Sequence, residues 1–312
     1  MRTYLVTGAA GFIGAAVAKE LIEQGHKVVS IDNLSTGVRD NLPEGTDFIE
    51  GDCQDPQVIE GLKQYQFDAI FHIAGQSSGE ISFDNPVYDL QTNAQSTLML
   101  LDYARHHGCN NVIYASTMSV YGDQPDFSID ESYTPRPKSF YGVGKLASEH
   151  YLRVYSANYG IGTSALRLFN VFGPGQNLEN MRQGMASIFM AMAIRESKML
   201  VKGDKRRYRD FVYIDDVVSA FLAAANRPQK DYECFNVCTG KRTYVEDVVD
   251  HINLNLDKAV PVTYVGSTPG DQFGIVGEPK KLISYTGWQP QVGFAEGMKQ
   301  MVDWAKMKLA ND

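Results

Sequence analysis

The chain has 312 residues, of which 44% are apolar and 21% are charged, and its formal net charge is −8. This composition is that of an ordinary globular protein with one large core, or with a core and a smaller appended unit. The acidic balance disfavours an extended nucleic-acid surface, and no apolar run reaches the roughly 18 residues that a membrane span needs.

The N-terminal segment MRTYLVTGAAGFIG carries glycines and a strand-like run where a signal peptide would have its apolar core, so we expect a cytoplasmic protein. The four cysteines are sparse and in that compartment remain thiols: Cys53, Cys109, Cys234 and Cys238. Cys234 and Cys238 share a strand-like segment with no histidine nearby, which favours buried thiols over a metal site. We expect no bound metal.

Short apolar runs alternate with helical patterns through the first half of the chain. This β–α–β alternation predicts an α/β fold, a doubly wound parallel sheet with helices on both faces. The runs that indicate strands are 3–8, 27–32, 67–75, 111–117 and 163–170, and the helical patterns are 11–25, 93–108 and 142–160.

The alternation ends near residue 172, where a loop rich in turn residues is followed by further helical patterns and one more strand-like run. We expect a cofactor-binding domain of the doubly wound (Rossmann) type at 1–171, to which 210–240 returns. A smaller, mixed α/β substrate-binding subdomain is expected at 172–209 and 241–312.

A glycine-rich turn joins the first expected strand to the first helix. Gly8, Gly11 and Gly14 allow a tight turn, close approach of the backbone to a pyrophosphate, and close helix–strand packing. The helix N-terminus offers N–H groups to the phosphates. The second strand ends in Asp32, where a carboxylate accepts the ribose hydroxyls of NAD and repels the extra phosphate of NADP. These features predict an NAD site, although Asp32 could instead only cap the turn that follows it.

The segment YGVGK places Tyr141 one helical turn before Lys145. An ammonium there, with a positive nicotinamide, would favour the phenolate and lower the tyrosine pKa from its usual value of about 10. Tyr141 could then accept a proton from a substrate hydroxyl. The spacing alone does not separate this role from that of a helix-start aromatic residue.

Other motifs are distributed along nearly the whole chain. The glycine spacing G-x-x-G-x-x-G, followed in order by GDCQD, HIAGQSS, ASTMSVYG, YGVGK, LRLFNVFGPGQ, RDFVYIDDVV and TGWQP, resembles the extended short-chain dehydrogenase/reductase family. That family includes NAD-dependent nucleotide-sugar epimerases and dehydratases. The ordered set is specific for the superfamily and much less specific for the substrate.

The resemblance implies that Tyr141 and Lys145 are catalytic, with the hydroxyl of Thr117 as the third member. Arg209 is expected to pair with a substrate phosphate. The full set implied for the cofactor is Gly8, Gly11, Phe12, Ile13, Gly14, Asp32, Asn33, Asp52, Cys53, Ala74, Gly75, Asn93, Ser116, Tyr141 and Lys145, and for the substrate Thr117, Met118, Tyr141, Asn170, Arg209 and Asp271.

The residues after Thr117 narrow the chemistry that the resemblance allows. Met118 and Ser119 stand where the 4,6-dehydratases carry an Asp-Glu pair, and Ser119 stands where the decarboxylating members carry a glutamate. Neither residue can act as a carboxylic acid. The resemblance then implies reversible C4 epimerisation of a UDP-hexose through a 4-keto intermediate. UDP-glucose and UDP-galactose come first, and N-acetyl or uronate forms stay open.

Three departures from the better-known 4-epimerases bear on the substrate. The better-known 4-epimerases have an arginine just before the dipeptide Gly-Asp near residue 270. This chain has no arginine in the segment 267–269, so one phosphate contact is absent or supplied from elsewhere. Asn180 or Arg182 could replace the asparagine that opens their cap helix. Ile275 stands near the place of a tyrosine that gates N-acetyl sugars, and a smaller residue leaves room for N-acetylhexosamines.

Other functions remain open at this point. The segment 74–76 is similar to that of the CDP-sugar 2-epimerases, and a one-way keto-sugar reductase would use the same catalytic residues with NADP. A non-enzymatic NAD-binding relative is disfavoured because Tyr141 and Lys145 are both present. The helices near 95–107 and 145–159 resemble those that pair in the family's homodimers, although they could simply pack on the sheet. No nucleic-acid or membrane partner is expected.

Overall fold

A seven-stranded parallel sheet runs through the centre of the computed structural model, which describes residues 1–123, 127–182, 184–226, 231–266 and 273–310. The strand order is β11–β6–β5–β4–β1–β2–β3, and every neighbouring pair is parallel. The strands are β1 (Thr3–Thr7), β2 (Lys27–Asp32), β3 (Asp47–Glu50), β4 (Ala69–His72), β5 (Asn111–Thr117), β6 (Gly162–Leu168) and β11 (Tyr232–Val237).

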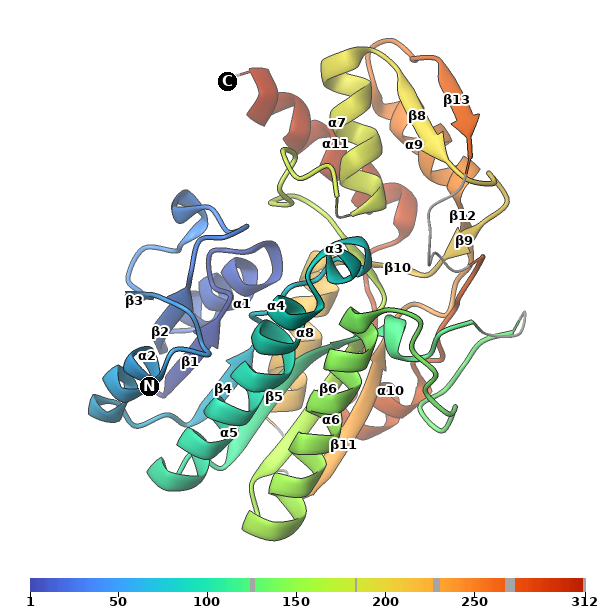
Figure 1. Cartoon of the computed structure of the whole chain (residues 1–312). Coiled ribbons are helices and arrows are strands. Elements are labelled where there is room, and N and C mark those ends of the chain that lie inside the picture. The colour runs from blue at the N-terminus through green and yellow to red at the C-terminus, as the bar shows by residue number, and fades with distance from the viewer. Residues whose placement is uncertain (124–126, 183, 227–230, 267–272, 311–312) are drawn as a thin grey trace.

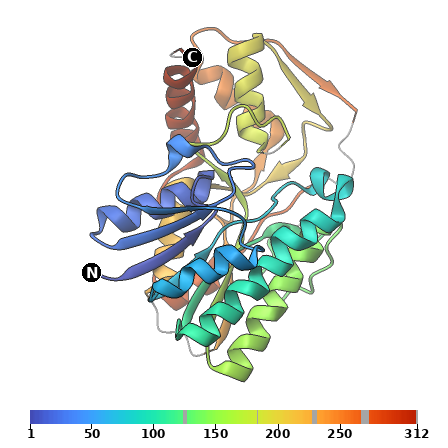
Figure 2. The ribbon, with the colours of Figure 1, turned by 60° about the vertical axis from the view of Figure 1, so that its left-hand side comes forward.

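Helices cover both faces of this sheet, as Figures 1 and 2 show. On one face α1 (Phe12–Glu23) packs against α8 (Ile214–Ala225), and on the other α5 (Ser96–His107) packs against α2 (Pro56–Gly61) and α6 (Phe140–Tyr159). The predicted doubly wound α/β fold is confirmed.

The central strands are apolar because both of their faces are buried. In β1, Tyr4 and Val6 belong to the core under α1 and α8, whereas Leu5 belongs to the core under α5 and α6. Successive side chains of a strand point to opposite faces, so one unbroken apolar run serves two cores.

The strand order reverses beside β1. The chain lays down β2 and β3 on one side of β1 and then crosses to place β4, β5 and β6 on the other. Loops at the carboxyl ends of β1 and β4 therefore run in opposite directions and leave a crevice, where ligands bind in folds of this type.

Smaller elements from the last part of the chain lie above this edge of the sheet in Figure 1. Three two-stranded sheets join β7 to β10, β9 to β12 and β8 to β13. The chain returns from them to the central sheet through α8 and β11, and α10 packs against β11. Their bounds are β7 (Asn170–Phe172), β8 (Met199–Lys202), β9 (Tyr208–Arg209), β10 (Phe211–Tyr213), β12 (Thr243–Tyr244), β13 (Val262–Val265), α7 (Met185–Glu196), α9 (Val245–Asn255), α10 (Lys280–Thr286) and α11 (Phe294–Ala310).

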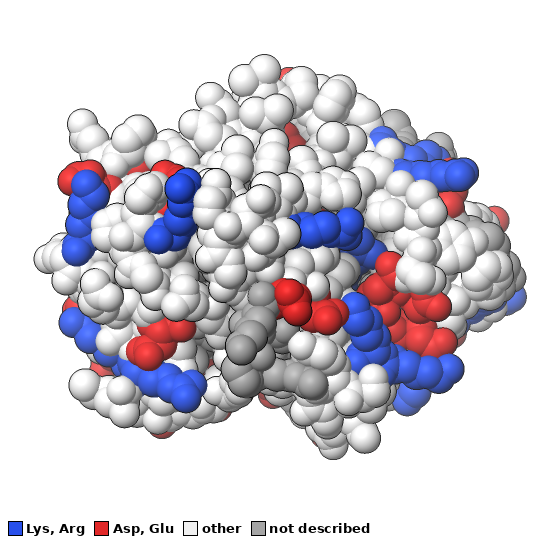
Figure 3. Space-filling model, turned by 90° about the horizontal axis from the view of Figure 1, so that it is seen from below, with Lys and Arg blue, Asp and Glu red and all other residues white. Residues whose placement is uncertain are grey.

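The short helices between β4 and α5 are α3 (Gly79–Asp84), α4 (Pro86–Leu90) and the π-helix η3 (Gln91–Gln95). Within the described part of the chain, no helix has the length and apolar character required to cross a membrane. Figure 3, which views the end of the molecule opposite the crevice, shows acidic and basic side chains interspersed rather than separated by sign.

Candidate active site

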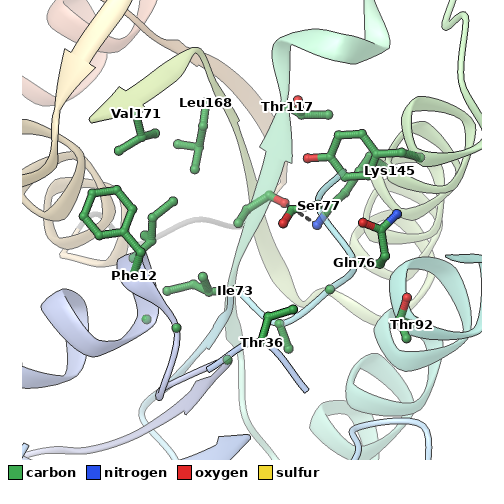
Figure 4. A pocket seen from close by; sticks show the side chains of 18 of the residues that line it. Phe12, Thr36, Ile73, Gln76, Ser77, Thr92, Thr117, Lys145, Leu168 and Val171 are labelled. Atoms are coloured by element: carbon green, nitrogen blue, oxygen red, sulfur yellow. Dashed lines mark hydrogen bonds between the residues drawn. The ribbon is translucent and has the colours of Figure 1, made fainter. Parts of the chain in front are cut away.

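A cavity of about 580 Å³ lies at the carboxyl ends of the central strands, where the strand order reverses. In Figure 4, Thr117 and Lys145 reach it from one side and Phe12 and Val171 from the other. The sequence-predicted residues that line it are Gly8, Gly11, Phe12, Ile13, Gly14, Asp32, Asn33, Asp52, Cys53, Ala74, Gly75, Ser116, Thr117, Met118, Tyr141, Lys145 and Asn170.

The glycine loop after β1 forms one wall of the cavity. Gly8 has φ +69°, and a Cβ there would lie 2.8 Å from the backbone nitrogen of Ala74. A Cβ on Gly14 would lie 2.0 Å from the carbonyl oxygen of Gly8, so only glycine lets α1 start this close to the strand. Gly11 precedes α1 without any side-chain cap, which leaves the first-turn N–H groups of the helix open to the cavity.

Asp32 ends β2 and is 7% exposed. Its Oδ2 accepts a 2.9 Å hydrogen bond from the N–H of Ala10, and its Oδ1 accepts a 2.8 Å bond from the N–H of Leu34. The carboxylate therefore shapes the turn and the glycine loop while it also lines the cavity. Both roles considered for it in the sequence are compatible with this geometry.

The loops after β3 and β4 close the same end of the cavity. Asn33 donates from Nδ2 to Oδ2 of Asp52 at 3.0 Å, which ties the loop after β2 to the loop after β3. Cys53 is buried there, and burial raises the pKa of its thiol to about 12, so it stays protonated. Gly75 has φ +155°, and a Cβ on it would meet Oδ1 of Asn93 at 2.4 Å and Nζ of Lys145 at 3.1 Å.

Tyr141 and Lys145 lie on the first turns of α6, which begins with a hydrogen bond from the N–H of Gly142 to Oγ of Ser139. Both side chains are nearly buried, and Nζ of Lys145 lies 6.0 Å from the centroid of the Tyr141 ring. The ammonium donates a 2.9 Å hydrogen bond to the carbonyl of Ala115 on β5. Thr117, at the end of the same strand, completes the group.

Burial dominates the protonation of the pair. It raises the pKa of the Tyr141 phenol to about 12, although a hydrogen bond with Thr117 acts in the opposite direction, and it lowers the pKa of the Lys145 ammonium to about 8. The hydrogen bond with Thr117 therefore favours the phenolate. The lowering of the tyrosine pKa by Lys145, which the sequence suggests, stays a prediction.

Asn93 lies in the π-helix η3 rather than in a regular helix, is fully buried and is not among the residues that line the cavity. Its Nδ2 donates to the carbonyl of Gln76 at 2.9 Å, and its Oδ1 has no hydrogen-bond partner. A Cβ on Gly75, which lines the cavity, would lie 2.4 Å from this Oδ1, so the unpartnered acceptor of Asn93 lies directly behind Gly75.

The far end of the cavity is lined by Met118, Asn170 and residues of the loop that follows β7. The side-chain oxygens Oδ1 of Asn170 and Oε1 of Gln176 are buried there without a hydrogen-bond partner. Buried amide oxygens are normally satisfied, so this end has spare acceptors for a polar ligand. Asn180 also lines the cavity, whereas Arg182 pairs with Asp84 at 2.5 Å.

Besides Asn93, the predicted positions Arg209 and Ile275 are not among the residues that line the cavity. Arg209 is buried in β9 and donates from Nη1 to the carbonyl of Tyr208 at 2.7 Å and to that of Phe273 at 3.3 Å. Ile275 packs in a small core with Phe169. Asp271 and the segment 267–269 lie outside the described residues.

Sequence reasoning did not single out several polar residues of the lining, among them Thr36, Ser77, Gln176 and Asn177. Gln176 is the last residue of the motif LRLFNVFGPGQ, and Asn177 follows it. Their position in the loop after an expected strand could have indicated that they line the site. No cluster of His, Cys, Asp and Glu able to hold a metal occurs among the described residues, and the four cysteines are free and buried.

Comparison with known proteins adds evidence of a different kind. The model of the NAD dependent epimerase/dehydratase family matches residues 4–238. A UDP-glucose 4-epimerase of Mycolicibacterium smegmatis is 34% identical over 314 aligned residues, which cover 99% of each chain.

Solved structures resemble the whole chain as well. The UDP-glucose 4-epimerase of Thermus thermophilus, in complex with NAD, superposes with a TM-score of 0.91 at 34% identity and covers 97% of this chain and 99% of its own. The UDP-glucose 4-epimerase of Thermotoga maritima, with UDP-glucose, superposes with a TM-score of 0.95 at 33% identity over 98% and 99% of the two chains.

Proposed function

The chain belongs to the NAD dependent epimerase/dehydratase family, and from that premise we propose that it is an NAD-dependent epimerase acting at C4 of a UDP-hexose. UDP-glucose and UDP-galactose are the first pair, with N-acetyl and uronate forms next. The observation that carries the proposal is the meeting of Tyr141, Lys145 and Thr117 in the cavity that the glycine loop also lines.

The cavity fits NAD by the shape and chemistry of its walls. The positions of Gly8 and Gly14 leave no room for a Cβ, which fits the tight turn and the close helix–strand packing of a dinucleotide-binding loop, and Gly11 between them lines the cavity. Asp32 would hold the adenosine ribose, and Lys145 the nicotinamide ribose. The unpartnered Oδ1 of Asn93 behind Gly75 adds an acceptor near that end.

Tyr141 is the proposed base that takes the proton of the sugar 4-hydroxyl and later returns it. Thr117 would hydrogen-bond the reacting oxygen and favours the phenolate of Tyr141. The positive charge of Lys145 would stabilise the same phenolate. NAD, when bound, supplies the acceptor for the sugar hydride and then the donor that returns it.

The residues beside Thr117 support epimerisation over elimination. Met118 lines the cavity, and neither it nor Ser119 carries a carboxyl group that could remove water from the keto sugar. The unpartnered oxygens of Asn170 and Gln176 are the groups that we propose for holding the nucleotide sugar while the ring turns over. The pairing of Arg209 with a substrate phosphate stays a proposal that rests on the family resemblance. Its described bonds run to backbone carbonyls.

We also propose a homodimer in the cytoplasm. Helices α3, α4 and α6 pack together and expose large apolar side chains on one side of the molecule. Such a cluster fits an interface with a second copy. We call this cluster the apolar patch: Phe83, Val87, Leu90, Phe140 and Val143.

The test is proton NMR of the purified protein, without added cofactor, incubated separately with UDP-galactose, UDP-N-acetylgalactosamine and UDP-glucuronate. We expect a new anomeric signal from the C4 epimer in at least one sample, and no signal with the Tyr141→Phe variant. Silence of the wild type in all three, persisting after NAD is added, would overturn the proposal. Turnover that consumes NADPH would favour a keto-sugar reductase instead.

A further inference from the structure

Asp89 is a buried carboxylate near the proposed catalytic pair that the mechanism above does not use. It lies in α4, immediately before the π-helix, and is 1% exposed. Its Oδ2 accepts a 2.7 Å hydrogen bond from Nε2 of Gln76. Its Oδ1 is buried and has no hydrogen-bond partner. A buried carboxylate with one oxygen unsatisfied is costly, so a compensating charge is expected nearby.

The unsatisfied oxygen faces α6. A Cβ placed on Gly144 would lie 3.3 Å from Oδ1 of Asp89. Gly144 follows Tyr141 by three residues and directly precedes Lys145. The free oxygen therefore lies against the turn of helix that carries both proposed catalytic side chains.

The electrostatic influence of Asp89 reaches both members of the pair. It raises the pKa of Lys145, against the lowering caused by burial, and it adds to the rise in the pKa of Tyr141. Burial raises the pKa of Asp89 itself, whereas the hydrogen bonds with Gln76 and Asn93 and, after them, the charge of Lys145 lower it.

The other titratable groups around α4 do not compete for this role. On α3, Glu80 and Asp84 are exposed and pair with Arg182 at 3.8 and 2.5 Å. From β4, His72 faces Lys145, and burial lowers its pKa to about 3, so it is neutral.

We propose that Asp89 is the buried counter-ion of Lys145 and, through it, a positioning residue for Tyr141. Its carboxylate keeps the ammonium charged through neutral pH, the state in which Lys145 donates to the carbonyl of Ala115. The inference rests on the proposed function only for the catalytic roles of Tyr141 and Lys145. The charge interaction between the two groups does not itself require turnover.

The first test measures the protonation of Lys145 directly, so it does not depend on activity. Acetic anhydride in trace amounts acetylates only the neutral amine, so the reaction is run at a series of pH values from about 6 to 10. Mass spectrometry of the peptide that contains Lys145 gives the pH at which acetylation is half-maximal. In the wild type we expect this midpoint near the pKa of about 8. We expect Asp89→Asn to lower this midpoint by about one pH unit, because an opposite charge is lost. Asp102→Asn removes an exposed carboxylate on α5 and should leave it unchanged.

An active enzyme gives the corresponding kinetic signature. Loss of the Asp89 charge lowers the pKa of both Tyr141 and Lys145, so both limbs of the pH profile of kcat/KM should move to lower pH. A folded Asp89→Asn variant with an unmoved Lys145 midpoint would overturn the proposal, whether or not the protein turns over a UDP-sugar.

A double-mutant cycle covers the case in which Asp89→Asn alone folds poorly. Lys145→Met leaves the carboxylate buried and unpaired, and the double variant removes both charges. Urea unfolding gives the ratio of folded to unfolded protein for each variant. We expect this ratio in the double variant to be about tenfold higher than the value obtained by multiplying the changes measured in the two single variants. Additive effects would show that the two charges do not interact.

Discussion

At the scale of single residues, Thr117 has an effect besides the proposed hydrogen bond to the substrate. It is the group in the structure that acts against burial and lowers the pKa of Tyr141. Its position at the end of β5 is fixed by parallel pairing with Leu168 on β6, so the hydroxyl is held by the sheet rather than by a loop.

Replacement of Thr117 by valine tests this role. Without the hydrogen bond the pKa of Tyr141 rises further, a smaller fraction is phenolate at neutral pH, and the acid limb of the kcat/KM profile should move to higher pH. We expect a loss of about 10²-fold at neutral pH, the lower end of what general acid–base catalysis supplies. Thr117→Ser keeps the hydroxyl and should retain most activity. A valine variant whose pH profile matches the wild type would show that the hydroxyl does not tune Tyr141.

At the scale of elements, the segment after β7 lines the cavity and is bonded to other loops on both sides. Asn177 donates from Nδ2 to the carbonyl of Thr36 at 3.4 Å on one side, and Arg182 pairs with Asp84 at 2.5 Å on the other. Oγ of Ser78 also donates to the carbonyl of Arg182 at 3.2 Å. These ties hold the segment over the proposed NAD site.

We expect Arg182→Gln to release NAD about two- to fivefold faster, since each exposed ion pair contributes only about 0.2–1 kcal/mol. Release can be followed by diluting the loaded protein into an NAD-consuming trap and measuring the fluorescence or mass of the remaining complex. Lys299→Gln removes a comparable exposed pair with Asp303 on α11 and should not change the rate. Equal rates for both variants would mean that the segment does not retain the cofactor.

At the scale of the whole molecule, the apolar patch predicts how two copies meet. Val87 and Leu90 of α4 are 66% and 58% exposed, and Val143 of α6 is 52% exposed. Large side chains of this kind exposed together on packed helices are unusual for a monomer.

The double substitution Leu90→Lys and Val143→Lys should convert a dimer into a monomer, because two buried charges per copy would have to be desolvated at the interface. Sedimentation equilibrium measures the change in mass. Lysines at Leu200 and Leu254, exposed apolar residues outside the patch, form the matched control. A wild-type protein that sediments as a monomer, or a patch variant that stays dimeric, would contradict the homodimer proposal.

The architecture could be predicted because its signals are local. The apolar run before Gly8 reflects a strand that is buried on both faces, and the helical period after Gly11 reflects a helix that is buried on one face. Neither pattern depends on a residue far away in the sequence. The position of Asp32 at the end of the second strand followed from the same alternation. These features allowed the position of the cofactor site to be predicted from the sequence.

The rest depended on contacts between distant parts of the chain. A helical pattern around Asn93 does not distinguish a π turn from a regular one, because five residues are too few to show the difference in period. The surroundings of Arg209 were set by the pairing of β9 with β12, which joins residues far apart in sequence. The nearness of Asp89 to Gly144 comes from the packing of α4 on α6, for which the sequence holds no spacing rule.

The late return of the chain to the central sheet has a consequence for biosynthesis. Six of the seven strands precede residue 169, but β6 gains its outer neighbour β11 only at Tyr232–Val237, after α8. A nascent chain that has not emerged beyond β11 exposes the unpaired edge of β6 and lacks the α8 side of one core. The nucleotide-binding half therefore completes its folding only after most of the polypeptide has left the ribosome, and truncated products are expected to aggregate rather than to accumulate as a free domain.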